Sequence, residues 1–508
     1  METSIVLIFL SVLAVSYYFI KRQFSFWQRY NVPFVKPVFP YGNLKDVGKK
    51  FHLCEMLMKF YNENKHRGPF VGLYFFLSPV VLLTDLDLVK SVMSKDFSVF
   101  QERHFYHNEK DDPLSAHLFA IDGTKWKNLR TKLTPTFTSG KMKFMFSTVL
   151  EIGERLSERL NTVVNESANQ CAEIELKNYW ARYTTDVIGS CAFGLECNTL
   201  NDKDALFREM GRQVFEEPRR SMGLQLLVIQ LKEWANYFGI KQLPDKPAEF
   251  FLKIVKETVA YRELNKVGRK DFMHLLIDLK NSSNTELSTI TENEIAAQAF
   301  VFFIAGFETS STLLSFCSYE LSQDQEIQEK IRNEVKNVLK QYNGEFTYDA
   351  MLEMKYLDQV LKEALRKYPP LATLTRGATE DYWVKDNDGN KLQLIPKGST
   401  VYIPVYAIHH DPDVYPDPKR FNPDRFLPEE ESKRHPYSYL PFGEGPRVCI
   451  GLRFGMMQAR IGLAKTLLNF KLSLGSNMNG INFSKKQNIL SNEGGIWIKL
   501  EKINEIQK

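Results

Sequence analysis

Cysteines are few in this sequence, and nothing in their spacing pairs them. The 508-residue chain has six cysteines with neither a disulfide-framework spacing nor a Cys-x-x-Cys pair, which argues against a disulfide-rich secreted domain or a zinc ribbon. Neither sign of charge is in large excess. The net charge of +5 is too small for this length to indicate a nucleic-acid partner. No Gly-x-Gly-x-x-Gly fingerprint occurs, so the sequence has no recognisable dinucleotide site. A reducing compartment fits this composition best.

Linkers are missing as well. No proline-, serine- or glycine-rich linker, low-complexity tract or internal repeat interrupts the chain after residue 45. Length alone would suggest several domains. The composition, with 44% hydrophobic and 25% charged residues, is ordinary for a globular protein, and we expect one large unit over residues 46–508.

An apolar run, Ile5 to Ile20, stands at the N-terminus and is closed by Lys21 and Arg22. It is slightly shorter than the ~20 residues that usually span a bilayer, but the aromatic residues after it extend it. A cleaved signal peptide is the alternative, although no basic segment precedes the run and no small-residue cleavage site follows it. We predict a membrane anchor over residues 1–22 with the rest of the chain cytoplasmic, and a proline-stiffened hinge over residues 23–45.

A glycine-rich loop, Pro441 to Gly451, presents one cysteine directly before a helical pattern. Apolar residues recur at three- and four-residue spacings from Leu452 to Leu468, so Cys449 is expected at the N-terminal end of a helix. Unpaired backbone N–H groups there favour an anion and would lower the pKa of the thiol, which makes a thiolate available as a ligand or nucleophile. For an isolated cysteine, a buried free thiol would be the better interpretation.

The residues around this cysteine form a longer pattern. Phe442, Gly445, Arg447, Cys449 and Gly451 reproduce Phe-x-x-Gly-x-Arg-x-Cys-x-Gly, and in this the chain resembles the cytochrome P450 haem-thiolate monooxygenases. The resemblance implies that Cys449 is the axial ligand of the iron of haem b, that Arg447 pairs with a haem propionate and that Phe442 packs near the thiolate. Such a thiolate pushes electron density toward the iron.

A long apolar segment begins at a capping box, Thr291-x-x-Glu294. It is apolar nearly all round, which is typical of a buried helix. Gln298 and Glu308 make it a poor candidate for a membrane span. We therefore expect a central helix in the core of the molecule.

Within that helix, Ala305 to Ser310 resembles the family's Ala/Gly-Gly-x-Asp/Glu-Thr-Thr/Ser motif. Thr309 can bond back to the carbonyl of Ala305, and Gly306 weakens the helix beside it, so a local opening that holds water is expected. An isolated Glu308 and Thr309 would simply satisfy each other. The resemblance instead implies that Glu308 and Thr309 deliver protons and that Ala305 and Gly306 approach the haem.

Two other patterns concern the haem propionates. Trp126 and Arg130 are four residues apart and share one helix face, which alone would be ordinary packing beside a surface charge. The resemblance implies that both donate to a propionate. It gives the same role to Arg376, which follows a Pro-Pro turn.

Glu363, Arg366 and Arg425 resemble the family's Glu-x-x-Arg and Pro-x-Arg-Phe elements. The resemblance implies a buried ion triad that fixes the loop leading to Cys449, and the loss of one member would leave an uncompensated buried charge. The adjacent pair His409-His410 lacks metal-ligand spacing, and we interpret it as structural.

Three regions carry further predictions. Residues 70–85 form two β-prone runs broken at Ser78-Pro79, which predicts a hairpin. Residues 222–240 are apolar and aromatic; core packing is the default interpretation, and an interfacial element that enters lipid near a substrate entrance is the alternative. Close to Trp126 lies a basic group that suits an acidic electron donor, unless it is only a solvated face: Lys127, Lys132, Lys141 and Lys143.

For the whole chain the resemblance implies a mainly α fold with a small β region, with haem between the central helix and the Cys449 loop. It implies a monooxygenase of the endoplasmic reticulum membrane that takes electrons from NADPH through a cytochrome P450 reductase, with cytochrome b5 as a further candidate donor. The run 133–143 is most similar to the insect xenobiotic-metabolising group, which implies lipophilic small-molecule substrates such as plant toxins and insecticides.

Two other classes of function stay open. A haem-thiolate isomerase or dehydratase needs no proton relay, so the Glu308–Thr309 pair argues against it. A haem-binding sensor or carrier would bind haem without consuming reductant.

Overall fold

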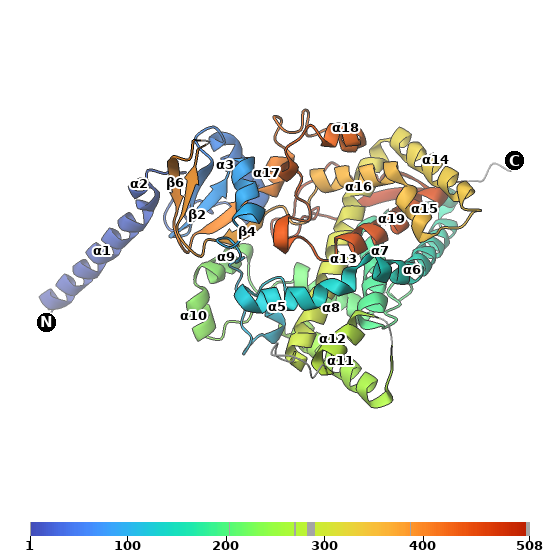
Figure 1. Cartoon of the computed structure of the whole chain (residues 1–508), viewed down its shortest axis with the longest axis horizontal. Helices are drawn as coiled ribbons and strands as arrows, with labels where there is room; N and C mark the ends of the chain where they lie inside the picture. The colour runs from blue at the N-terminus through green and yellow to red at the C-terminus, as the bar shows by residue number, and fades with distance from the viewer. Residues whose placement is uncertain (1, 203, 269–270, 282–289, 387, 504–508) are drawn as a thin grey trace.

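The computed structural model describes residues 2–202, 204–268, 271–281, 290–386 and 388–503 (Figure 1). The predicted domain limits at residues 1 and 508 therefore lie outside the described residues. The helices are α1 (Glu2–Phe24), α2 (Phe26–Arg29), α3 (Leu53–Asn64), α4 (Leu86–Lys90), α5 (Gly123–Leu133), α6 (Ser139–Asn165), α7 (Leu176–Ile188), α8 (Leu206–Glu216), α9 (Met222–Gln230), α10 (Lys232–Tyr237), α11 (Asp245–Asn265), α12 (Phe272–Asn281), α13 (Glu292–Gln323), α14 (Gln325–Gln341), α15 (Tyr348–Glu353), α16 (Lys355–Lys367), α17 (Val405–His409), α18 (Pro428–Glu431) and α19 (Leu452–Asn469).

Short turns of 3₁₀ or π helix connect these elements. They are η1 (Ser91–Lys95), η2 (Pro113–Ser115), η3 (Thr134–Phe137), η4 (Ala168–Gln170), η5 (Gly189–Phe193), η6 (Pro423–Phe426), η7 (Pro436–Ser438) and η8 (Gly445–Arg447).

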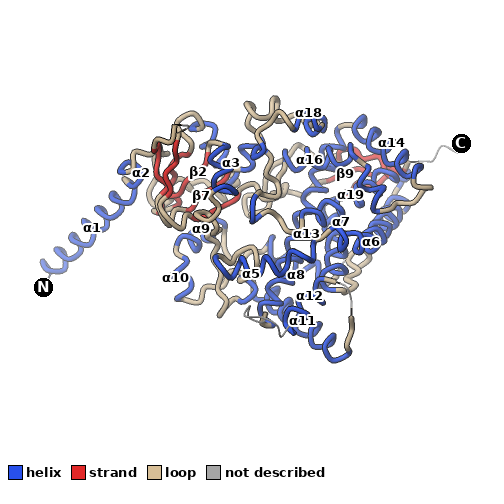
Figure 2. Tube along the Cα trace, viewed as in Figure 1, coloured by secondary structure: helices blue, strands red, loops and turns tan. Residues whose placement is uncertain are grey.

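Strands occupy a small part of the molecule, and the prediction of a mainly α fold with a small β region is confirmed (Figure 2). One sheet has the order β1-β2-β7-β4, in which only β2 and β7 run parallel, and consists of β1 (Phe70–Phe75), β2 (Ser78–Leu83), β7 (Thr400–Ile403) and β4 (Leu374–Gly377). A second has the order β3-β9-β8, from β3 (Cys171–Glu175), β9 (Trp497–Lys502) and β8 (Phe470–Leu474). A third pairs β5 (Tyr382–Lys385) with β6 (Lys391–Ile395).

The predicted hairpin is β1 and β2, which pair antiparallel with Phe75 opposite Ser78. Its turn falls at Phe76 and Leu77, two residues before the predicted break at Ser78-Pro79. Phe76 takes a left-handed backbone with φ 55°. Ser78 and Pro79 therefore belong to β2.

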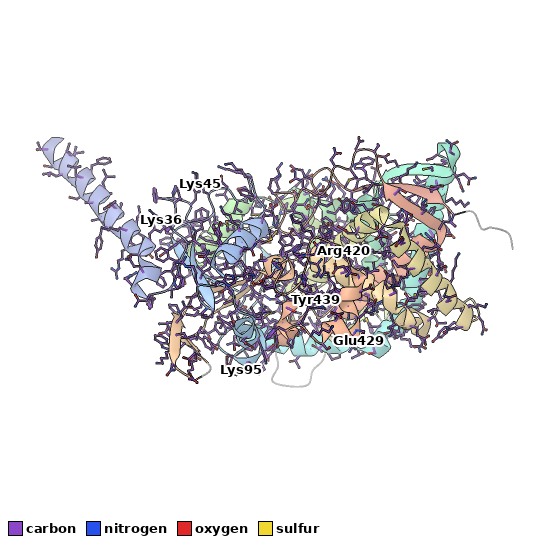
Figure 3. All side chains as sticks on the ribbon, turned by 90° about the horizontal axis from the view of Figure 1, so that it is seen from above. Lys36, Lys45, Lys95, Arg420, Glu429 and Tyr439 are labelled. Atoms are coloured by element: carbon purple, nitrogen blue, oxygen red, sulfur yellow. The ribbon has the colours of Figure 1, made fainter. Side chains whose placement is uncertain are left out.

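The N-terminal helix α1 projects from the body of the molecule as a separate rod (Figures 1 and 3). Its 23 residues extend roughly 35 Å at 1.5 Å per residue, enough to cross the apolar part of a bilayer. Large apolar side chains along it are exposed, with Ile8 at 65% and Val15 at 68%. This helix fits the predicted membrane anchor.

The segment predicted as a hinge packs against the first sheet. Trp27 is fully buried, and its indole Nε1 donates to the carbonyl of Leu73 at 2.9 Å. Gly72 makes room for it, since a Cβ at Gly72 would lie 2.4 Å from Trp27 Cγ. The Val35 N–H also donates to the Gly72 carbonyl. A hinge over residues 23–45 stays a prediction.

The central helix is α13, and it begins at the predicted capping box, in which Thr291 and Glu294 each accept from the other's backbone N–H. It packs against α7, α11, α16 and α19. The most apolar stretch of this helix is 72% buried. The side-chain oxygen of Gln298 accepts a hydrogen bond from the Leu118 N–H at 2.8 Å. As predicted, α13 is a core helix.

The default interpretation of residues 222–240, core packing, is wrong for most of their large side chains. The segment forms α9 and α10, in which only a few residues such as Met222, Leu226 and Ala235 are buried. Trp234 is 63% exposed, Tyr237 81% and Phe238 65%. α9 contacts β1, and α10, which carries Trp234 and Tyr237, lies at the end of the molecule from which α1 projects (Figure 1).

Candidate active site

A deep cavity separates α13 from the loop that carries Cys449. The empty volume of the cavity, counted together with its opening to solvent, is about 1630 Å³. All the residues predicted to contact haem line it, and so does Thr309: Trp126, Arg130, Ala305, Gly306, Arg376, Phe442, Arg447 and Cys449. Residues from four separate parts of the sequence therefore meet at one place.

The cysteine loop is held in a conformation that needs glycine. Gly445 has φ 72°, and a Cβ there would lie 2.0 Å from the Met93 carbonyl oxygen, so any side chain would clash with the backbone of η1. The Cys449 N–H donates to the Phe442 carbonyl at 2.9 Å. α19 begins three residues later at Leu452, as the sequence predicts.

The Cys449 thiol lines the cavity and lies deep inside the molecule. The expectation that its pKa is lowered is wrong for the protein alone. Removal from water raises the pKa of the thiol, and this outweighs the Gly451 N–H and the positive charges of Arg130 and Arg103, which act in the opposite direction.

Positive charge collects at one end of the cavity. The guanidinium of Arg447 lies 4.1 Å from the centre of the Trp126 ring and 2.8 Å from the Asp122 carboxylate. Arg376 is 2% exposed, and burial lowers the pKa of both Arg376 and Arg447 to about 10. Burial also lowers the pKa of Arg130, on α5.

Arg103 belongs to this group, and the sequence analysis missed it. Its guanidinium donates to the carbonyls of Phe119 at 3.0 Å and Arg447 at 3.1 Å. Burial, followed by the charges of Arg376 and Arg447, lowers its pKa well below the usual value. The next residue, His104, takes a left-handed backbone with φ 57°. No motif surrounds Arg103, so only the fold could reveal it.

These residues fit haem. Two buried nitrogens, Arg376 Nε and Arg447 Nη1, have no hydrogen-bond partner among the described residues, and such donors are costly unless an acceptor reaches them. Four arginines against the Asp122 carboxylate leave an excess of positive charge. A group with two carboxylates and an apolar body complements that charge and the largely apolar wall, and the Cys449 sulfur is a suitable iron ligand.

The opposite wall of the cavity is formed by α13. Thr309 Oγ1 donates to the Ala305 carbonyl at 2.6 Å, which confirms the predicted bond back along the helix. Gly306 lets α13 approach α7, since a Cβ there would lie 2.7 Å from Ile188 Cδ1. A hydroxyl group therefore stands in an otherwise mostly apolar wall.

Glu308 is not part of that wall. Its carboxylate pairs with Lys177 of α7 at 2.9 Å, and both side chains are nearly buried. Successive residues of a helix point about 100° apart, so the acid and the hydroxyl of Thr309 face different neighbours. The structure does not bring the two predicted proton-delivery groups together, and the role of Glu308 stays a prediction.

The predicted ion triad is assembled. Arg366 donates two hydrogen bonds, of 2.7 and 2.9 Å, to the Glu363 carboxylate, and both side chains are fully buried. Arg425 Nε lies 3.5 Å from the same carboxylate.

His409 extends this cluster toward the cysteine loop, and the sequence analysis found no such link. Its Nδ1 lies 3.0 Å from the Arg366 carbonyl, and its Nε2 accepts from the Leu440 N–H at 2.8 Å. The Tyr439 ring, labelled in Figure 3, stacks on the His409 ring. The imidazole is thus structural, as predicted.

Comparisons with known proteins agree with this geometry. The family model for cytochrome P450 matches residues 32–500. The chain is 44% identical to the probable cytochrome P450 6a14 of Drosophila melanogaster over 97% of this chain and 98% of that protein. It is also 44% identical to cytochrome P450 6A1 of Musca domestica, over 93% of this chain and 92% of that protein. Together with the cysteine loop, the arginines and the central helix, these matches show that the chain belongs to the cytochrome P450 family of haem monooxygenases.

Proposed function

We propose that this protein inserts one oxygen atom from O₂ into lipophilic small molecules, with electrons from NADPH delivered by a separate cytochrome P450 reductase. The observation that carries the proposal is the cavity in which the Cys449 thiol and the Thr309 hydroxyl stand on opposite walls. Haem b, when bound, supplies the redox chemistry and the activation of oxygen.

The chain's own residues hold the haem. Cys449 provides the sulfur ligand, and Phe442, whose carbonyl accepts from the Cys449 N–H, restricts the thiolate. Arg376 and Arg447 offer unpaired buried donors to the propionates. Trp126 and Arg130 complete this binding site on α5, and Ala305 and Gly306 line the facing wall on α13.

Proton delivery is the second task of the protein. Splitting O₂ consumes protons, and a hydroxyl in an apolar wall can orient a proton donor. Thr309 has this position. Glu308 would serve as the acid that resupplies it, and it would then have to leave Lys177, because the ion pair holds it on another face of the helix.

Substrates are expected to be apolar. The cavity wall includes Leu118, Phe119, Val301, Leu371 and Leu374, which offer contact surface and few polar groups that would select a hydrophilic molecule. Together with the insect relatives, this favours xenobiotics such as plant toxins and insecticides.

The basic surface over the cavity is a docking site for the reductase. Lys127 on α5 and Lys141 and Lys143 on α6 are exposed. α5 also carries Trp126 and Arg130 of the cavity wall, and α6 carries Met145. Acidic electron donors would be attracted there, most strongly at low salt. Cytochrome b5 could use the same surface.

Exchanging two of these charges tests the docking site. Lys127→Glu with Lys141→Glu should slow reduction by the reductase at low ionic strength and much less at high ionic strength. Lys471→Glu, an exposed lysine on β8, is the control. Equal reduction rates in the double variant and the control would contradict the proposed surface.

The membrane proposal is an endoplasmic reticulum anchor with the catalytic unit on the cytoplasmic side. Lys21 and Arg22 stand at the end of α1 nearest the body, where the positive-inside rule favours the cytoplasm. Lys36 and Lys45 are exposed at the same end of the molecule (Figure 3) and would face anionic headgroups.

The experiment that tests the function is the spectrum of dithionite-reduced protein under carbon monoxide, recorded for wild type and Cys449→Ser. A Soret band at the strongly red-shifted thiolate position, absent from the variant, is expected. Turnover with reductase and NADPH, stimulated by an apolar substrate, would then separate a monooxygenase from a haem carrier. A histidine-like band, or no haem, would refute the proposal.

A further inference from the structure

The side chain of Gln458 joins α19 to α13 at the cavity wall. It is fully buried, and its Nε2 donates to the Gly306 carbonyl at 3.0 Å and to Ser310 Oγ at 2.6 Å. The backbone around it is also fixed, because Tyr183 Oη donates to the Gln458 carbonyl at 2.9 Å. Three helices, α7, α13 and α19, therefore meet at this residue.

The orientation of the Gln458 amide follows from its neighbours. The Gly306 carbonyl can only accept a hydrogen bond, so the amide nitrogen and not the oxygen must face it. Oε1 then points elsewhere, and it is buried without a partner among the described residues. Buried acceptors are nearly always satisfied, by ordered water when the protein supplies no donor.

The surroundings suit such a water molecule. Gln458, Gly306, Thr309 and Ser310 all line the same cavity, and they form a polar strip in a mostly apolar wall. Ser310 Oγ accepts from Gln458, which leaves its own proton available for donation. A water on Oε1 would have a second polar group close by.

We propose that Gln458 is a positioning residue for proton delivery: Nε2 holds α13 at Gly306 and Ser310, while Oε1 holds a water molecule that passes protons toward Thr309. This inference rests on the proposed monooxygenase function. The water gives one proton toward the cavity and regains one from the solvent, so no charge accumulates on the glutamine.

The test uses the full-length, haem-loaded protein with reductase and measures hydrogen peroxide released per NADPH consumed. Q458M keeps the volume and removes both polar groups, and it should raise the peroxide fraction several-fold, in the direction expected for Thr309→Ala. Q458E should restore coupling at neutral pH, because desolvation raises the pKa of a buried carboxyl and keeps it protonated. Its hydroxyl can then donate to Gly306 while its carbonyl oxygen holds the water.

A pH profile separates positioning from simple bracing. As the pH rises and the new carboxyl of Q458E ionises, it loses its donor to Gly306, so its peroxide fraction should increase with pH more steeply than that of wild type. The control is Q328M, because Gln328 is equally buried but all its polar atoms are bonded, to Leu321 and Leu472. Q328M should lower thermal stability without raising the peroxide fraction.

A crystal structure of the loaded protein gives a readout that is independent of turnover. Density for a water within hydrogen-bond distance of Gln458 Oε1, lost in Q458M, is expected. The inference is overturned if no water is there, if Q458M is as well coupled as wild type, or if Q458M and Q458E lose coupling equally without a pH dependence. Each of these results can occur in a protein with an intact thiolate spectrum, so they are distinct from failure of the proposed function.

Discussion

Buried guanidinium groups decide which end of the cavity can hold an anionic group. Arg376 Nε and Arg447 Nη1 have no partner among the described residues, and burial lowers the pKa of both side chains. Each would gain from a carboxylate more than an exposed arginine would, because it has already lost its hydration. Arg103, which is half-buried, adds a third cation whose charge acts on these two.

Replacing Arg103 by leucine should weaken haem retention by about tenfold or more. Removing one partner of a buried charge contact costs about 2–5 kcal/mol, and about 1.4 kcal/mol corresponds to a factor of ten. The measurement is the rate of haem transfer to excess apomyoglobin. The matched control is Arg420→Leu, since Arg420 is exposed (Figure 3). Equal transfer rates for the two variants would mean that Arg103 only supports neighbouring backbone.

At the residue scale, the sequence identifies site residues that belong to a long motif, and it identifies few others. Cys449, Arg447 and Thr309 could be predicted because several fixed spacings identify them together. Arg103 could not, because it stands in a loop and contacts Arg447, 344 positions away along the chain. Glu308 shows the reverse problem: it is next to Thr309 in sequence, yet it pairs with Lys177 on another face of the helix.

Among the elements, α16 controls the cysteine loop through a chain of hydrogen bonds. Glu363 orients Arg366, the Arg366 carbonyl meets the His409 ring, and that ring accepts from the Leu440 N–H. Leu440 directly precedes the loop. Since every member is buried, a defect at Glu363 should reach Cys449 without any direct contact.

Glu363→Ala should therefore lose haem and stability rather than show a pure catalytic defect. It leaves Arg366 buried without its carboxylate, which typically costs about 3–5 kcal/mol. Haem content per chain and the apparent Tm are the measurements. Glu430→Ala is the control, because Glu430 forms an exposed pair with Lys433 at the same three-residue spacing. Full haem content in Glu363→Ala would contradict a structural role for the triad.

A second prediction at this scale concerns α9 and α10. A chain that lacks α1 should still bind phospholipid vesicles through Trp234, Tyr237 and Phe238, because exposed aromatic side chains favour the membrane interface. Changing all three to serine should abolish most of this binding in a sedimentation assay. Leu264→Ser, at another exposed apolar residue, should not. Binding that persists in the triple variant would place the contact elsewhere.

The helices could be predicted where a cap or a clear periodicity marks the start, as the cap does at Thr291 and the periodicity does at Leu452. Residues 222–240 could not, because an apolar sequence predicts contact with something other than water but not with what. The packing of α9 against β1 determines which side chains are buried. Protein covers one side of the segment, and the aromatic side chains remain exposed to solvent.

At the scale of the whole molecule, the buried residues form two clusters, one around the first sheet and one around α13. The sheet combines β1 and β2 with β4 and β7 from the C-terminal half of the chain (Figure 1). Pairings between such distant segments have no local signal in the sequence. The fold class followed from the family motifs, whereas the register of this sheet required the structure.

Burial of neutral histidines predicts how the stability of the whole molecule depends on pH. Burial lowers the pKa of His117 and His410 to about 3, and that of His409 falls well below its usual value. His409 must be neutral with its proton on Nδ1, because its Nε2 accepts from Leu440. The unfolded chain takes up protons at these residues below about pH 6.5, and the folded chain does not. Stability is therefore present at pH 7.5 and is lost as the pH falls toward 5.5.

Each such histidine should remove about 1.4 kcal/mol of stability at pH 5.5, one unit below the pKa of the unfolded form. The apparent Tm, recorded at a constant scan rate, should thus fall from pH 7.5 to 5.5. His409→Gln should reduce this fall by the share of one histidine, since a glutamine can still accept from Leu440 and donate to Arg366. His66→Gln should leave it unchanged, because His66 is exposed. If the Tm of the wild type did not change over this range, or if His409→Gln changed it no more than His66→Gln, the buried histidines would not control the acid stability of the protein.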